Sequence, residues 1–318
     1  MSTDESHIDC LTTGRNTPDF TLSAATIGLK AVDILSQAKT FIIRGVTSRG
    51  VFVAVDDKVI LFLSKERFKG PLIVNLPWDP VVLDQIAIQA EGRVCSRGLR
   101  FSSPNLFIDI SRAEAWSACS QWNSSPLPGS MPTNQQISAF LRMLQSRAES
   151  PNEMVAAALR VIQTDNLPQR PESDETIQHL SQAYLSLQTG DMPALQSVAH
   201  FLAGRGRGLT PSGDDFLLGL VYGLFMLPNQ FQSIREIASA AIVDQVRTRS
   251  TLISANLVEC AAMGEVDERL GAAFQTLLHP DSPSDTAIHG ILGWGSSSGM
   301  DASAGMAVLI AAANENID

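Results

Sequence analysis

The chain has 318 residues, of which 44% are hydrophobic and 18% are charged, a composition typical of a globular protein with a large core. This length favours two domains over one. The formal net charge of −10 argues against a nucleic-acid-binding surface, because such surfaces need clustered Lys and Arg. The longest apolar run, residues 216–227, is too short to span a bilayer. We therefore expect neither nucleic acid nor a membrane as a partner.

The four cysteines are scattered and form no C-x-x-C pair, so we expect neither a disulfide framework nor a structural zinc site; they are Cys10, Cys95, Cys119 and Cys260. The polar, acidic N-terminus does not have the pattern of a signal peptide. Together these observations predict a cytoplasmic protein.

The first part of the chain is rich in β-strand signals. Residues 22–38 show helical periodicity, and short β-branched runs follow them. Two runs, 51–55 and 59–63, flank the turn signal Asp56-Asp57 and predict a hairpin. Further runs lie at 41–45, 71–76, 92–96, 99–101 and 106–110. We predict an α+β protein that begins with a segment and helix over 1–38, followed by an antiparallel, barrel-like β-rich domain over 39–120.

Residues 117–133 are rich in Ser, Pro, Asn and Gly, which is typical of a linker or of an ordered surface crossing. Beyond them β-strand signals nearly vanish and helical patterns take over. These patterns lie at 137–148, 154–163, 177–188, 194–203, 216–227, 234–248, 252–263 and 302–313. We predict a mostly α-helical domain over 121–318.

Two segments of the helical half share the spacing Ser-Gly-x-Asp-x-x-x-Gly. The matched residues are Ser212, Gly213, Asp215 and Gly219 in the first copy and Ser298, Gly299, Asp301 and Gly305 in the second. In both copies a glycine- and hydroxyl-rich loop leads into an apolar helical pattern. A helix start carries unpaired N–H groups and a partial positive charge, which suits an anion. We predict that the two helix starts assemble one site.

Helix capping explains part of this pattern, because Ser followed three residues later by Asp is a capping box. Ser212 or Ser298 would then accept a hydrogen bond from the N3 amide. Three features point beyond capping. Glycine in a first turn weakens a helix by about 1 kcal/mol and is useful where something approaches the backbone closely. The loop 204–208 alternates Gly with Arg, and Asp214 adds a second carboxylate beside Asp215.

These features predict an oxyanion substrate, either a small carboxylate or phosphate, held by amides, hydroxyls and arginine. The candidate substrate-binding residues are Arg207, Gly208, Thr210, Ser212, Gly213, Thr251, Ser254, Ser297, Ser298 and Gly299. The candidate catalytic residues are Asp214, Asp215 and Asp301, which would position a proton or a Mg²⁺ ion. Thr251 and Ser254 either donate to the anion or belong to a plain helix junction with solvated arginines. The five histidines have no metal-ligand spacing, and His289 lies closest to the second copy.

The stretch 206–219, GRGLTPSGDDFLLG, resembles the AllH family, long catalogued as a domain of unknown function and associated with the oxamate carbamoyltransferase of allantoin degradation. Residues 251–254 and 297–301 support the resemblance, which runs from about the first strand to the C-terminus. It implies a subunit of an assembly that transfers a carbamoyl group between oxalurate and phosphate, giving oxamate and carbamoyl phosphate. Relatives often carry a histidine where Ser296 stands here, so no role is carried over from that histidine.

Three functions remain open at this point. The first is a catalytic subunit with the anion bound at the helix N-termini. The second is a non-catalytic scaffold or binding subunit that needs partner chains, which the lack of a recognisable nucleophile or base triad favours. The third is a metabolite sensor, which would bind a ligand without any reaction.

Overall fold

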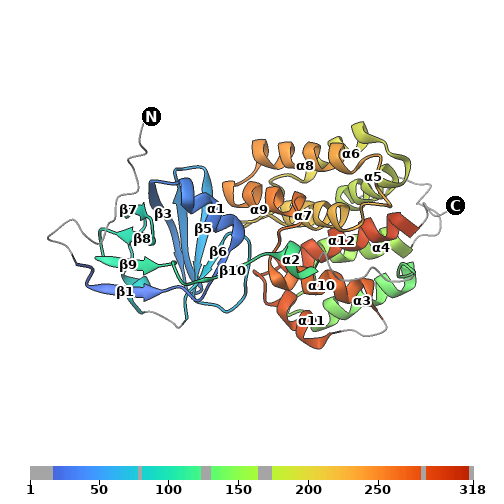
Figure 1. Ribbon diagram of the computed structural model, residues 1–318. Helices are drawn as coiled ribbons and strands as arrows, with labels where there is room; N and C mark the ends of the chain where they lie inside the picture. The colour runs from blue at the N-terminus through green and yellow to red at the C-terminus, as the bar shows by residue number, and fades with distance from the viewer. Residues whose placement is uncertain (1–16, 78–80, 123–129, 164–173, 281–283, 315–318) are drawn as a thin grey trace. The chain divides into compact units, whose positions relative to one another are not determined.

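The computed structural model describes residues 17–77, 81–122, 130–163, 174–280 and 284–314. The chain divides between Ser117 and Ala118 into two compact units. Within the described residues, the first unit holds the strands and the second holds only helices (Figure 1). The predicted α+β class, with the strands in the N-terminal part, is therefore confirmed.

The first unit is built on one curled sheet with the strand order β1-β9-β8-β7-β3-β4-β5-β6-β2-β10. Most neighbours are antiparallel, but β1–β9, β5–β6 and β2–β10 are parallel, so the sheet is mixed. The strands are β1 (Phe20–Ser23), β2 (Thr26–Gly28), β3 (Thr40–Thr47), β4 (Gly50–Val55), β5 (Val59–Ser64), β6 (Ile73–Asn75), β7 (Glu91–Cys95), β8 (Gly98–Phe101), β9 (Leu106–Asp109) and β10 (Glu114–Trp116). Helix α1 (Leu29–Gln37) packs against β2 and β10, and a 3-10 turn spans Val81–Gln85.

The predicted hairpin is confirmed as β4 and β5, which pair antiparallel from Gly50↔Ser64 to Val55↔Val59. Asp56 and Asp57 both have positive φ angles, 46° and 53°, and the Lys58 amide donates to the Val55 carbonyl oxygen at 3.0 Å, as in a type I′ turn. The helix predicted over 22–38 is wrong over residues 22–28, because that stretch holds the end of β1 and the strand β2. Residues 1–16 of the segment predicted over 1–38, Cys10 among them, lie outside the described residues.

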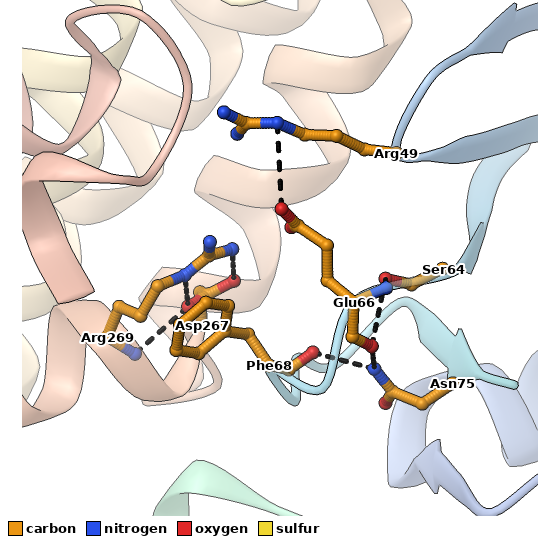
Figure 2. Close-up of polar contacts among 7 residues, drawn as sticks. All are labelled: Arg49, Ser64, Glu66, Phe68, Asn75, Asp267 and Arg269. Carbon is orange, nitrogen blue, oxygen red and sulfur yellow. Dashed lines mark hydrogen bonds and ion pairs between the residues drawn. The ribbon is translucent and has the colours of Figure 1, made fainter. Parts of the chain in front are cut away.

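Asn75 secures the crossover loop between the parallel strands β5 and β6 (Figure 2). Its Nδ2 donates to the carbonyl oxygens of Glu66 and Phe68, both at 2.8 Å. The Ser64 hydroxyl accepts from the Glu66 amide at 3.0 Å, and the Glu66 carboxylate lies 3.5 Å from Arg49. Asn75 is buried, and its side chain satisfies two carbonyl groups of the loop.

Cys119 and Cys260 are free thiols, and Cys10 lies outside the described residues. Among the described helices none combines the length and the apolarity needed to cross a bilayer.

The second unit is helical, with α7 (Ser212–Met226) and α12 (Ser298–Asn314) at its centre (Figure 1). Both helices are buried on almost every side, which suits their apolar sequences. Around them lie α2 (Ala118–Trp122), α3 (Asn134–Arg147), α4 (Glu153–Gln163), α5 (Glu175–Thr189), α6 (Met192–Leu202), α8 (Arg235–Arg249), α9 (Leu252–Ala262), α10 (Glu268–Leu278) and α11 (Asp285–Leu292). Part of the predicted linker over 117–133, residues 123–129, lies outside the described residues.

Helix α10 begins with a buried ion pair. Asp267 caps the helix by accepting from the Arg269 amide at 2.9 Å, and its carboxylate also binds the Arg269 guanidinium through contacts of 2.8 and 2.7 Å (Figure 2). Both side chains are about 95% buried. The two-pronged geometry fixes this helix start, and removing either partner would cost a buried, charge-assisted contact.

Helices α7 and α12 cross at backbone contact distance. A Cβ atom at Gly219 would lie 1.9 Å from the Ala302 carbonyl oxygen, and one at Gly305 would lie 2.0 Å from the Phe216 carbonyl oxygen. The two contacts are related by the motif spacing, because Gly219 and Gly305 occupy the same position in their copies, as do Phe216 and Ala302. Glycine at the last motif position is therefore required by the crossing.

Gly219→Ala and Gly305→Ala should each lower the free energy of unfolding by about 3 kcal/mol, at the upper end of overpacking costs, because a backbone oxygen cannot move aside. Gly223→Ala is the matched control on the same helix, since its Cβ would meet only the tip of the Leu309 side chain. Urea denaturation checks the order. Equal losses at Gly219 and Gly223 would contradict the close crossing.

Candidate functional site

The two predicted helix starts meet in the second unit. Thr210, just before α7, lies 3.0 Å from the hydroxyl of Ser298, the first residue of α12. The same Thr210 hydroxyl donates to Asp215 Oδ2 at 3.1 Å. The Ser298 hydroxyl also approaches Asp215, and the Ser212 hydroxyl approaches Asp301. Each aspartate is thus approached by the first residue of the opposite helix.

Asp215 and Asp301 form a buried carboxyl pair. Each is only 1% exposed. Burial raises the pKa of Asp215 well above its ordinary value; hydrogen bonds from Ser298 and Thr210 oppose the rise, and the charges of Asp301 and Asp214 add to it. Burial also raises the pKa of Asp301, against hydrogen bonds from Asn152, Ser297 and Ser212. The proton-bound form of these carboxyls therefore persists above the pH at which a solvated Asp ionises.

Asp214 points to a different set of partners. Its carboxylate accepts from the Gly204 amide at 2.7 Å and from the Ser250 hydroxyl. These two hydrogen bonds connect the start of the glycine–arginine loop, residues 204–208, and the junction between α8 and α9 to the first turn of α7. Asp214 is 1% exposed, and these contacts position the loop.

The capping explanation for the two serines is wrong in detail. The residue at the N-cap of α7 is Pro211, and its side chain makes no capping hydrogen bond. Ser212 and Ser298 are the first residues of their helices. Their hydroxyls are therefore turned toward the opposite aspartates rather than toward their own first turns.

The first-turn amides already have partners in the chain. In α7, the amide of Gly213 donates to the Arg205 carbonyl, and those of Asp214 and Asp215 donate to the Pro211 carbonyl. In α12, the amide of Gly299 donates to the Trp294 carbonyl, and those of Met300 and Asp301 donate to the Ser297 carbonyl. These six N–H groups are not open donors, so they do not support the predicted anion binding.

Gly213 and Gly299 are required by the chain itself. A Cβ at Gly213 would lie 2.1 Å from the Leu202 carbonyl oxygen, at the end of α6. A Cβ at Gly299 would lie 1.9 Å from the Ile291 carbonyl oxygen, near the end of α11. The close approach predicted from these glycines exists, but the approaching group is the preceding helix in each copy.

The loop before α7 is exposed and lies beside the start of α9. Gly204, Gly206 and Gly208 have positive φ angles of 76°, 126° and 98°. Thr251 caps α9, accepts from the Ser254 amide, and donates to the Leu209 carbonyl at 2.8 Å. Thr251 and Ser254 thus border the loop that carries Arg207, whose side chain is exposed. The structure brings these predicted residues together around the loop.

Two other predicted features lie differently. His289 is exposed on α11, where its Nδ1 lies 2.8 Å from the Asp285 carbonyl oxygen of the same helix. Within the described ranges, no three or more His, Cys, Asp or Glu side chains gather as they would around a metal ion. We derive no step through a Mg²⁺ ion.

The sequence interpretation missed one residue of the site. Asn152 lies just before α4, and its Nδ2 donates to Asp301 Oδ1 at 2.8 Å. The only sequence signal at this position is an Asn before a helical pattern, which predicts a cap and nothing more. Its contact with Asp301 spans 149 residues of chain.

Residues 202–310 match the family model of the oxamate carbamoyltransferase subunit AllH. This stretch is about a third of the chain; it begins at the last residue of α6 and contains both motif copies. The resemblance to the AllH family is confirmed over this stretch, which relates the chain to a carbamoyltransferase subunit. No match was found among curated proteins or among solved structures.

The raised pKa of Asp215 predicts a pH-dependent penalty on stability. Below the ordinary value of 3.8 the carboxyl is protonated in both folded and unfolded states, and the penalty is absent. As the pH rises toward the folded-state pKa, the unfolded state gains stability by ionising first. Relative to wild type, Asp215→Asn should therefore become progressively more stable as the pH rises above about 4, up to the folded-state pKa.

Thermal unfolding of both proteins across pH 3–8 checks this sign. Asp191→Asn controls for the loss of one negative charge, because Asp191 is an exposed helix cap and Asn caps equally well. A constant difference in Tm between Asp215→Asn and wild type would show that burial does not shift the Asp215 pKa.

Proposed function

We propose that the chain is a subunit of a carbamoyltransferase acting on small carboxylates, and that Asp215 and Asp301 carry its proton chemistry. The observation that carries the proposal is that each of these two buried carboxyls is approached by the first residue of the opposite helix, inside the stretch that matches the AllH family. The resemblance to the AllH family suggests the reaction, and we assign proton transfer within that reaction to Asp215 and Asp301.

The reaction implied by the resemblance requires one proton to change place. A phosphate oxygen bonds to the carbamoyl carbon of oxalurate, and the bond from this carbon to the oxamate nitrogen breaks. The leaving nitrogen gains a proton, and the attacking hydrogen phosphate loses one. Two adjacent carboxyls with raised pKa values are suited to this exchange, because one in the acid form can donate while an ionised one accepts.

The anion would bind at the exposed loop rather than at the first-turn amides. Arg207 is exposed on this loop, and the Thr210, Ser212 and Ser298 hydroxyls are half-buried between the loop and the carboxyl pair. A guanidinium pairs well with carboxylate or phosphate, and hydroxyls can donate to either. The proposed binding site also includes four further residues of the loop and its neighbours: Gly208, Thr251, Ser254 and Ser297.

A non-catalytic subunit is the second candidate. The observation that favours it is that both carboxyls are buried and all six first-turn amides described above are already paired. In that case the Ser–Asp contacts only join α7 to α12, and the loop serves to bind a metabolite or a partner chain.

The two candidates are separated by reconstituting the chain with its partner subunits and measuring phosphate-dependent cleavage of oxalurate. Asp215→Asn and Asp301→Asn should each reduce kcat at least about 100-fold, the lower end of general acid–base contributions, while the assembly still forms. Asp191→Asn is the control and should keep full activity. Turnover that survives both carboxyl substitutions would favour the non-catalytic subunit.

A further inference from the structure

Asn152 makes two side-chain hydrogen bonds with opposite ends of its amide. Its Oδ1 accepts from the Val155 amide at 2.8 Å and so caps α4. Its Nδ2 donates to Asp301 Oδ1 at 2.8 Å. The residue is buried, and its own amide N–H bonds to Gln145 Oε1 at 3.3 Å. Rotation of the side chain would break both side-chain contacts, so Asn152 holds Asp301 in one orientation.

The two oxygens of Asp301 are unequal as a result. Oδ1 accepts from Asn152, whereas Oδ2 is buried and has no well-formed hydrogen bond among the described residues. The Ser212 and Ser297 hydroxyls approach the same carboxyl group and are themselves half-buried. A buried acceptor without a full partner is costly, so it marks a place for a proton or for an N–H donor.

We propose that Asn152 is a positioning residue, which binds Oδ1 of Asp301 so that Oδ2 is the atom that exchanges a proton with the substrate nitrogen. Asn152 acts only through Asp301 and does not touch the substrate. The inference rests on the proposed function, because it assigns the proton exchange to one atom of the carboxyl pair. It also predicts the chemical class of the group beside Oδ2, an amide nitrogen.

The charged groups that act on Asp301 set the direction of the test. Glu153 on α4 disfavours ionisation of Asp301, and the Asn152 donor favours it. Asp215 on α7 also interacts with Asp301, whose charge raises the pKa of Asp215. Removing the Asn152 donor should therefore raise the pKa of Asp301 further. Adding a carboxylate at position 152 should raise it more, because a second negative group would then act on Asp301 beside Glu153.

The decisive variant is Asn152→Ser, which separates the two contacts of Asn152. Serine caps helices as well as Asn does, so the bond from the Val155 amide can be kept, but its short hydroxyl cannot replace the amide donor to Asp301. Asn152→Asp is the second variant, since it keeps the cap and the shape while repelling Asp301. Thr133→Ser, a similar exchange at the capped start of α3, is the matched control.

Carboxyl ¹³C NMR titration of the isolated chain gives a readout without activity, with the Asp301 signal assigned by its loss in Asp301→Asn. The Asp301 pKa should rise by about one unit in Asn152→Ser and further in Asn152→Asp, and stay constant in Thr133→Ser. In the reconstituted assembly, the pH profile of kcat should move upward in the same order with KM nearly unchanged.

An unshifted Asp301 titration and an unshifted kcat profile in Asn152→Ser and Asn152→Asp would overturn the positioning role and leave Asn152 as a helix cap. This outcome is distinct from failure of the proposed function. If Asp301→Asn keeps full turnover, the proposed function fails, whereas if Asp301→Asn is inactive and Asn152→Ser behaves as wild type, only the positioning inference fails.

Discussion

The structure of the helical unit depends on the backbone crossing of α7 and α12. Gly219 and Gly305 allow the carbonyls of Ala302 and Phe216 to approach where any side chain would clash. This crossing holds the first turns of both helices together and brings Asp215 and Asp301 out of water. Burying an ionised carboxylate costs several kcal/mol, and each hydrogen bond to it returns about 1.5–3 kcal/mol. The few hydroxyl and amide donors here only partly offset this cost, so the pKa values of both carboxyls stay raised.

The paired motif predicts one feature of the structure correctly and another incompletely. Its spacing predicts two similar helix starts, and the structure brings them into contact. The glycines also predict close approach to the backbone, but sequence cannot name the approaching group. Gly213 and Gly299 accommodate the carbonyls of Leu202 and Ile291, so their conformational requirement comes from helix packing. Helix packing also removes the support for anion binding at six first-turn amides, because these N–H groups donate to backbone carbonyls of the chain itself.

Local signals predicted most of the fold, and distant contacts account for what was missed. The β4–β5 hairpin follows from two β-branched runs and the Asp56-Asp57 turn, all within fifteen residues. In contrast, β1, β2 and β10 are strands of three or four residues with parallel partners, too short for a periodic pattern. The role of Asn152 is equally hard to predict from local sequence, because its partner Asp301 lies far along the chain.

The two motif copies share the same spacing, but their aspartates, Asp215 and Asp301, differ chemically because different residues surround them. Thr210 and Ser298 surround Asp215, and no amide side chain donates to it among its described contacts. Asp301 instead receives the Asn152 amide at one oxygen and keeps the other without a full partner. A carboxyl pair can divide donor and acceptor roles only if its two members have different environments. The neighbours from α4 and from the loop before α7 therefore supply the asymmetry that the repeated motif lacks.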